Sequence, residues 1–486
     1  MSVSSALSSL PSSPAASTEP KTKPKTGTET NTETDPHSET NRETAASQAT
    51  EFNTQTLADL DASQCSVRTR ARSKTAARST HRATTTTNRK RKQRSSAENG
   101  AKRRKEDDGR AEIGITASAA GSKMLVGAHV SMAKGVHNAI TNAAAIGGTA
   151  LALFLKNQRR WVSAPLPDAD AAAFRRLAEA HGIDPRTQVL PHGSYLINLA
   201  TPAPDKAAQA YDCFVDDLRR CEVLGIGLYN FHPGSTLGAP RADALARIAA
   251  ALNRAHAETS SVTTVIENMA GAGNVIGGPF EDLRDIIAGV ADQNRVGVCL
   301  DTCHLFAAGH DLRSAAAYAD VMDRFDAIVG RRFLRALHLN DSKGPLASHK
   351  DLHCNIGLGH LGLEAFRLIM NDPRLRGLPL VLETPSGDDP SVWAREIALL
   401  HSLVGLRGDE DAFLALAQQL HDQGQAERER VSDVVRRVQQ QKEAKQARQD
   451  KGVAAAAKKT KKTKKTKKDE HVGSNGAGES DGRCSH

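Results

Sequence analysis

The sequence has few aromatic residues, few cysteines and no long apolar run. Aromatic residues make up 3% of the 486 residues, and there are seven cysteines. Because the cysteines show no paired spacing, a small disulfide-stapled fold is excluded and a reducing compartment is indicated. No apolar run reaches the roughly 18–20 residues that a membrane span needs. We therefore expect no membrane partner.

Composition divides the chain into three parts. Residues 1–122 are rich in Ser, Thr and charged residues and contain one Phe, so they are predicted to be disordered. Residues 123–406 carry the periodic apolar runs of a folded domain, long enough for a large core. From residue 407 onward the chain is polar and helix-prone, and it then becomes a Lys-rich tail with a Lys/Thr repeat (458–468), predicted to be disordered. The parts have net charges of +6, −2 and +5, so the basic balance belongs to the tails.

The N-terminal part contains two basic clusters, NRKRKQR (88–94) and KRRK (102–105). Two such clusters joined by a short polar spacer resemble a bipartite nuclear localisation signal. The alternative is a solvated basic arm that contacts nucleic-acid phosphates without specificity. The nucleus is the expected location. A share in mitochondria stays open, although the absence of Arg before residue 42 and the presence of Glu19 give a transit peptide little support.

From Met124 the pattern alternates between short apolar strands and helical stretches. We expect eight strands, at 124–130, 150–156, 188–192, 228–232, 263–268, 296–301, 336–341 and 380–384. This alternation implies parallel pairing with right-handed crossovers. Eight such units in about 280 residues are typical of a (β/α)8 TIM barrel, an α/β fold. A doubly wound open sheet is the alternative, but no Gly-rich phosphate loop follows the first strand.

Imidazoles and carboxylates recur where these strands end, the edge at which barrels carry their chemistry. The candidate metal ligands are His192, His232, Glu267, Asp301, His304, His338, Asp351, His353 and Glu383. The first strand also ends in His129. Taken singly, each has an ordinary explanation: a core histidine, a glutamate paired with Arg, or, for Asp301, a helix cap.

Taken together on one rim, these groups are hard to explain by packing. Unpaired carboxylates in such a cluster would repel one another and raise each other's pKa, and divalent cations remove that penalty. Mixed His/carboxylate sets suit Zn²⁺, and Mn²⁺ and Fe²⁺ are alternatives. Cys299 and Cys303 look like half a zinc site, but no second cysteine pair completes it. Nine ligands can serve two or three ions, and clustered ions are the usual device for phosphodiester hydrolysis.

The motif series then resembles a known family. Eight segments are similar, in order, to the motifs of endonuclease IV, the zinc-dependent apurinic/apyrimidinic endonucleases of base excision repair. They are GAHVS, KNQRRW, LPHGSYLINLA, NFHPGS, ENMAGAGN, DTCHLFAAGHD, HLNDSK and LETP. The resemblance spans about 123–405. It implies a deoxyribonuclease that cuts duplex DNA on the 5′ side of an abasic site, leaving a 3′-hydroxyl and a 5′-deoxyribose phosphate. It also implies cleaning of blocked 3′ ends.

The resemblance further implies three zinc ions per chain. His192, His232 and Glu267 would hold the first. Glu267 would bridge to a second, completed by Asp301, His338 and Glu383. His304, Asp351 and His353 would hold the third, and Glu267 would help to position the attacking hydroxide. Arg159, Tyr195 and Leu196 match the family positions that enter the DNA base stack, where without the resemblance we would expect a surface Arg and a buried Tyr-Leu pair. We expect a monomer.

The sequence departs from the family pattern at a few positions. Leu352 stands where the family usually has Arg, and Met269 and Ala272 replace polar residues. Two other functions compete with the nuclease. A barrel sugar isomerase or epimerase would need about four ligands and would leave His304, Asp351 and His353 unexplained. A non-catalytic damaged-DNA-binding protein would act through the basic tails.

Overall fold

The computed structural model describes residues 123–387, 389 and 391–472. The expected disorder of residues 1–122 and the two basic clusters lie outside the described residues. The described part belongs to a single compact unit, Asp108–His486.

Seven parallel strands form the main sheet, in the order β2-β1-β9-β6-β5-β4-β3. Their bounds are β1 Leu125–His129, β2 Ala150–Ala152, β3 Leu228–Phe231, β4 Thr263–Glu267, β5 Val296–Asp301, β6 Leu334–Leu339 and β9 Pro379–Leu382. A separate antiparallel pair, β7 (Asp341–Ser342) and β8 (His353–Cys354), lies in the long connection after β6. Seven of the eight expected strands are therefore present, with ends shifted by a few residues.

The expected strand at 188–192 is wrong as a regular strand, yet this segment closes the barrel. Gln188 ends a short helix, and Pro191 has no N–H to donate to a neighbouring strand. Parallel bridges still join Val189 to β2 and His192 to both Phe154 and Asn230. The His192 N–H donates to the Leu153 carbonyl (2.9 Å), and the Asn230 N–H donates to the Pro191 carbonyl (2.8 Å). The segment thus connects β2 to β3, and the TIM-barrel prediction is confirmed.

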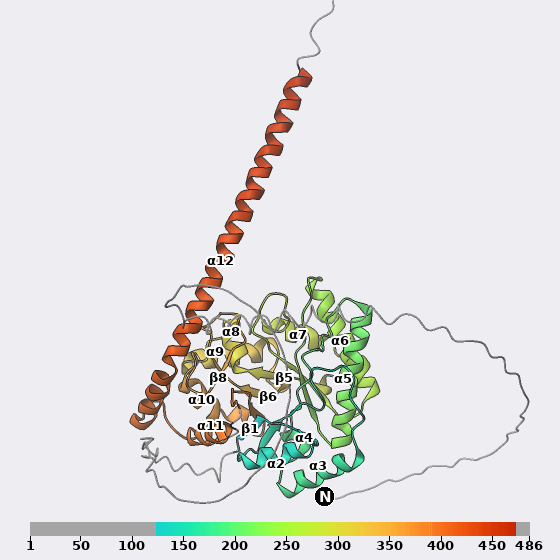
Figure 1. Ribbon diagram of the computed structural model, residues 1–486, viewed down its shortest axis with the longest axis vertical. Coiled ribbons are helices and arrows are strands. Elements are labelled where there is room, and N and C mark those ends of the chain that lie inside the picture. The colour runs from blue at the N-terminus through green and yellow to red at the C-terminus, as the bar shows by residue number, and fades with distance from the viewer. Residues whose placement is uncertain (1–122, 388, 390, 473–486) are drawn as a thin grey trace, which may run out of the picture. The chain divides into compact units, whose positions relative to one another are not determined.

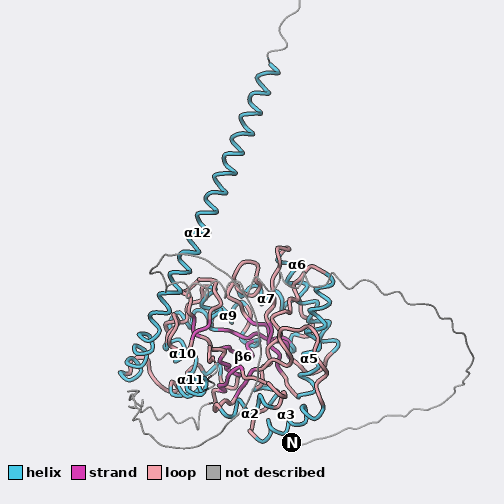
Figure 2. The backbone as a smooth tube through the Cα atoms, viewed as in Figure 1, coloured by secondary structure: helices cyan, strands magenta, loops and turns pink. Residues whose placement is uncertain are grey.

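Helices cover the outside of the strands, as Figures 1 and 2 show. Their bounds are α2 Asn138–Ala145, α3 Asp168–Ala180, α4 Pro185–Gln188, α5 Pro204–Leu224, α6 Arg241–Glu258, α7 Phe280–Ala288, α8 Thr302–Ala308, α9 Ala315–Ile328, α10 Leu363–Met370, α11 Ser391–Ser402 and α12 Asp411–Val472. Three short 3-10 turns precede strands: η3 Gln293–Arg295, η4 Arg331–Phe333 and η5 Pro373–Leu375.

Two apolar clusters hold the barrel together. The large one lies between the strands and the surrounding helices and includes Phe174, Phe214 and Phe366. The small one takes a single side chain from each of five neighbouring segments: Leu190, Leu228, Val265, Cys299 and Ala336. Because side chains alternate along a strand, we infer that these five fill the barrel axis. The polar ligands at the strand ends therefore lie next to a packed apolar layer inside the barrel.

The last helix, α12, is 62 residues long. It continues through the Lys/Thr repeat to Val472, so the prediction of a disordered tail is wrong for this stretch. Lys and Ala are both good helix formers, and Thr costs only a few tenths of a kcal/mol. None of the helices within the described residues is long and apolar enough to span a membrane.

Candidate metal centre

The nine ligands predicted from the sequence converge on one end of the barrel. They fall into three sets whose ligand atoms lie within 4.8 Å of one another. The sets are His192, His232 and Glu267; Glu267, Asp301, His338 and Glu383; and His304, Asp351 and His353. These are the sets that the family resemblance implies, although the residues come from seven separate segments of the chain.

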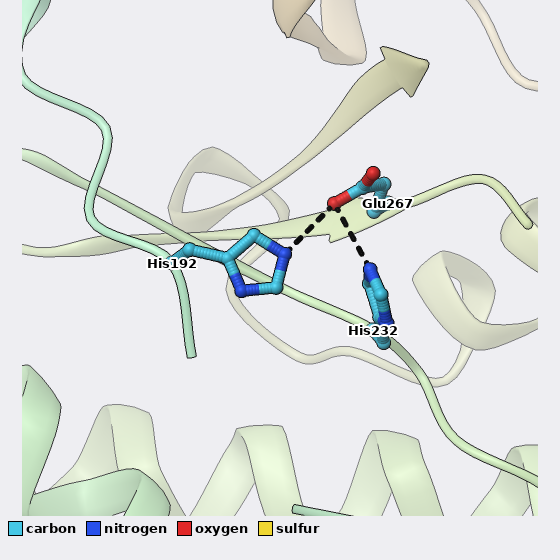
Figure 3. Close-up of side chains that lie close together, drawn as sticks. All are labelled: His192, His232 and Glu267. Carbon is cyan, nitrogen blue, oxygen red and sulfur yellow. Dashed lines mark ion pairs between the residues drawn. The ribbon is translucent and has the colours of Figure 1, made fainter. Parts of the chain in front are cut away.

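Glu267 joins the first two sets. It ends β4 and is fully buried. Its Oε2 lies 3.3 Å from Nε2 of His192 and 3.5 Å from Nε2 of His232, as Figure 3 shows. Its Oε1 lies 3.0 Å from Nδ1 of His338. Nδ1 of His304 lies 3.4 Å from the same Oε1. One carboxylate thus faces imidazoles with both of its oxygens, the arrangement that a bridging ligand requires.

The second set is completed from β5, β6 and the end of β9. Asp301 and His338 are fully buried, and they stand opposite each other in the β5–β6 register. Oε2 of Glu383, just beyond β9, lies 3.3 Å from Nδ1 of His338. The other oxygen of Glu383 lies 3.1 Å from Nδ1 of His129. His129 ends β1, and it supports the Glu383 carboxylate from outside the three sets.

The third set is built differently, because Asp351 lies in the loop between β7 and β8 and His353 begins β8. Nε2 of His304, in α8, is 3.1 Å from Oδ2 of Asp351. Nε2 of His353 is 3.1 Å from the other oxygen of the same carboxylate. The Asp351 side chain is 46% exposed, whereas that of His304 is 1% exposed. This set therefore lies at the open side of the site.

The ring orientations fit metal binding. Nδ1 of His192, His304 and His353 lies 2.7, 2.9 and 3.2 Å from the backbone carbonyls of Gly193, Asn268 and Glu383. Because a carbonyl only accepts, each Nδ1 carries a proton and donates it. Nε2 is then the nitrogen that faces the carboxylates and can take a cation.

The charges also fit. Burial opposes ionisation of Glu267, but the imidazoles of His338 and His232 hold its pKa well below the usual value. Burial likewise opposes protonation of His353, but Asp351 and its neighbours raise the pKa of that imidazole to about 9. The buried carboxylates are thus ionised only because positive charge lies beside them. Bound divalent cations would supply it in place of these protons.

Three asparagines that were not among the predicted site residues orient the ligands. Nδ2 of Asn230 donates to Glu267 (2.5 Å), and Nδ2 of Asn340 donates to Asp301 (2.6 Å). Oδ1 of Asn268 accepts from the Asp301 N–H (2.7 Å). All three are fully buried. Their position one or two residues from a ligand, in NFH, EN and HLN, was the available signal.

The ordinary explanation for Asp301 also holds. Its Oδ1 accepts from the His304 N–H (2.7 Å) and caps α8, so one carboxylate serves both the helix and the ligand set. Cys303 lies close to Asp301 and His353, but burial raises the pKa of its thiol. Burial also raises the pKa of Cys299, to about 12. Neither cysteine favours the thiolate that a metal would bind.

Of the three residues expected to contact DNA, Tyr195 lies beside the ligands, and Leu196 follows it in the chain. Arg159 is exposed, and Leu196 is half-buried. Tyr195 is 56% exposed, which corrects the buried Tyr-Leu pair expected without the resemblance. The centroid of its ring lies 5.2 Å from the ring centroid of His192 and 5.4 Å from that of His232. An exposed aromatic ring beside the ligands offers a stacking surface at the site.

Comparison with known proteins agrees with this geometry. A family model described as a xylose isomerase-like TIM barrel matches residues 140–403. Apurinic-apyrimidinic endonuclease 1 of Schizosaccharomyces pombe is 49% identical over 283 residues, covering 58% of this chain and 82% of that protein. Probable endonuclease 4 of Chlorobium phaeovibrioides is 51% identical over 279 residues, 57% of this chain and 99% of that protein. The crystal structure of endonuclease IV from Thermus thermophilus is 34% identical, with a TM-score of 0.51 and coverage of 57% and 98%.

Proposed function

The chain belongs to the endonuclease IV family within the xylose isomerase-like TIM barrels, and we propose that it hydrolyses the phosphodiester bond 5′ to an abasic site in duplex DNA. The products are a 3′-hydroxyl and a 5′-deoxyribose phosphate, and the same site trims blocked 3′ ends. Its place is in base excision repair. The names of the relatives, apurinic-apyrimidinic endonuclease 1 and endonuclease 4, support the proposal.

The observation that carries the proposal is the shared carboxylate of Glu267. It is fully buried and faces His192, His232 and His338 at 3.0–3.5 Å. Two adjacent ion sites that share a ligand suit in-line displacement at phosphorus, because attacking and leaving oxygens need stabilisation at the same time.

We propose that the three ligand sets hold three Zn²⁺ ions. Only His nitrogens and carboxylate oxygens are needed, which is a donor set that zinc accepts. When bound, the ions would lower the pKa of water and neutralise charge on the phosphate. The chain holds their ligands rigid through buried asparagines and backbone carbonyls.

The chain's own residues supply recognition. The exposed ring of Tyr195 and the neighbouring Leu196 would replace the stacking lost at the abasic site, and Arg159 would contact phosphate. The enzyme would act as a monomer on double-stranded DNA. We place it in the nucleus on account of the basic clusters 88–94 and 102–105, and a mitochondrial share stays open.

The isomerase alternative is disfavoured by the third ligand set. Sugar isomerisation in a barrel needs about four ligands around one or two ions, and His304, Asp351 and His353 would then have no role. A purely binding protein would have no use for three converging sets. Metal content separates these hypotheses, since we expect about three zinc ions per chain.

The test is incision of a labelled duplex that carries one abasic-site analogue. Glu267→Gln should lower incision by at least about a thousandfold, since the side chain serves two ion sites. Glu281→Gln, at an exposed position of α7, is the matched control and should cut normally. A single 5′ cut that survives brief EDTA and is lost on prolonged chelation supports the proposal. Normal turnover by Glu267→Gln, or a β-elimination product, would overturn it.

A further inference from the structure

The first turns of α12 pack against the barrel, although α12 begins beyond the residues 140–403 that the family model matches. Phe413, Leu416 and Val431 are only 2%, 6% and 3% exposed. Phe413 and Leu416 belong to the large apolar cluster. This part of α12 is therefore an integral layer of the fold.

What these turns cover is the short segment 357–360. Nη1 of Arg428 donates to the Leu358 carbonyl (2.8 Å), and Arg428 is 6% exposed. Oγ of Ser432 lies 3.1 Å from Nε2 of His360. The backbone at Gly424 lies so close to Leu358 that a Cβ there would overlap the Leu358 carbonyl oxygen. The helix and the segment thus meet through the Arg428 hydrogen bond, the contact between Ser432 and the His360 ring, and direct backbone packing at Gly424.

Segment 357–360 is in turn tied to β7. The His360 N–H donates to the Ser342 carbonyl (2.7 Å). The buried carboxylate of Asp341 accepts N–H groups from the other side of the connection, those of Gly357 (3.1 Å), Gly359 (3.0 Å), Leu361 (2.9 Å) and Gly362 (3.2 Å). A displacement of 357–360 would therefore move β7.

β7 pairs with β8, which carries a ligand of the third set. Ser342 stands opposite His353 in the register, and the Lys343 N–H donates to the Leu352 carbonyl (2.9 Å) between Asp351 and His353. The ligands of the first two sets stand at barrel strands or directly beyond them. Asp351 and His353 instead lie on this hairpin, and Nδ1 of His353 also contacts the Glu383 carbonyl.

We propose that α12 is the positioning element of the third metal site. It holds segment 357–360, and through Asp341 and Ser342 it fixes the hairpin that presents Asp351 and His353. The inference rests on the proposed metal-binding function of these residues. It assigns to a helix outside the catalytic barrel the task of keeping one of three ions.

Gly424 gives the sharpest test. Glycine inside a helix costs about 1 kcal/mol relative to alanine, so Gly424→Ala should favour the helix itself while forcing it away from Leu358. Arg428→Ala removes the bond to the same carbonyl. The controls are Gln425→Ala, whose side chain bonds Glu429 in its own helix, and Arg436→Ala, whose side chain pairs with Asp433.

Two readouts are needed besides incision: zinc per chain during graded chelation of the full-length protein, and amide hydrogen exchange over 353–362 in metal-free protein. For both test variants we expect one ion of three to be lost at about 10–100-fold lower chelator concentration. Faster exchange over 353–362 should accompany that loss. The two controls should match the wild type in both readouts.

Unchanged zinc retention and exchange in both test variants would overturn the proposal, and so would equal weakening of all three ions. Failure of the proposed function would look different. If the wild type cut no abasic duplex, or held no zinc, the exchange of segment 353–362 in metal-free protein would still decide whether α12 positions the hairpin.

Discussion

At the scale of single residues, the site depends on side chains whose orientation is fixed by several neighbours. Glu267 is surrounded by imidazoles and by the amide of Asn230, so its two oxygens have no freedom to rotate. Asn340 spans two ligands, since its amide nitrogen donates to Asp301 and its oxygen accepts from the Glu383 N–H (3.2 Å). Such fixed neighbours lower the entropic cost of binding an ion.

Tyr195 gives a prediction at this scale. Tyr195 is exposed, and stacking of an aromatic ring on a base contributes about 1–3 kcal/mol to the free energy of binding. Tyr195→Ala should therefore weaken binding to an abasic duplex by about 5–150-fold. Tyr195→Phe keeps the ring and should bind within about threefold of the wild type. Fluorescence anisotropy in the presence of zinc measures both affinities. Zinc content should stay the same in both variants, and equal affinity of Tyr195→Ala would show that the ring does not contact DNA.

At the scale of elements, parallel strands bring distant residues together. The carboxyl ends of β4, β5 and β6 meet at one rim, which places Glu267, Asp301 and His338 side by side. Strand alternation sends neighbouring side chains to the barrel axis or outward. Helix ends contribute as well, because Asp301 both caps α8 and belongs to a ligand set.

The contact between α6 and β4 gives a prediction on pH. His256, in the last turn of α6, lies with Nε2 3.1 Å from Oγ1 of Thr264. Burial, with Arg295 nearby, lowers its pKa to about 4. The unfolded chain takes up this proton near pH 6.5, whereas the folded chain does so only near pH 4. The free energy of unfolding should therefore fall as pH drops through this window.

His256→Gln removes this titration and keeps an amide that can reach Thr264. Between pH 6.5 and 4 the variant should lose about 1–2 kcal/mol less stability than the wild type, after allowance for solvent screening. Urea unfolding at several pH values measures the difference. Parallel pH profiles for both proteins would mean that His256 titrates alike in the folded and unfolded states.

At the scale of the whole molecule, positive charge and chemistry occupy different parts of the chain. Residues 123–406 carry a net charge of −2, whereas the C-terminal 80 residues carry +5. The bound ions would make the site locally positive, and the tail would add affinity for any phosphate backbone. The attraction by the tail would not depend on DNA sequence or damage, whereas the attraction by the ions would act only at the site.

The Lys/Thr repeat gives a prediction at this scale. Its eight lysines (458–468) would release counterions on binding DNA, so deletion of the repeat should flatten the slope of log K against log salt. Affinity for undamaged duplex should fall at low salt, and the rate of incision at saturating substrate should not change. Deletion of residues 473–480 serves as the control. An unchanged slope after removal of the repeat would exclude it from DNA binding.

The sequence alone determined the barrel class and the candidate ligands, because both depend on local patterns. A short apolar strand that ends in His, Asp or Glu can be recognised in the sequence without knowledge of the strands beside it. The family motifs then implied which ligands belong together. The one strand that was wrong, 188–192, contains Pro191, and its pairing with β2 and β3 depends on partners that no local pattern shows.

Only the tertiary structure decided how the ligands are supported. Asn230, Asn268 and Asn340 are ordinary polar residues in the sequence, and only the fold turns their side chains toward Glu267 and Asp301. The same holds for α12. Its polar composition predicts a helix but no partner, since the close approach of Gly424 to Leu358 joins residues 66 positions apart. Local patterns specify which groups carry the chemistry, whereas contacts between distant segments specify where each group is held.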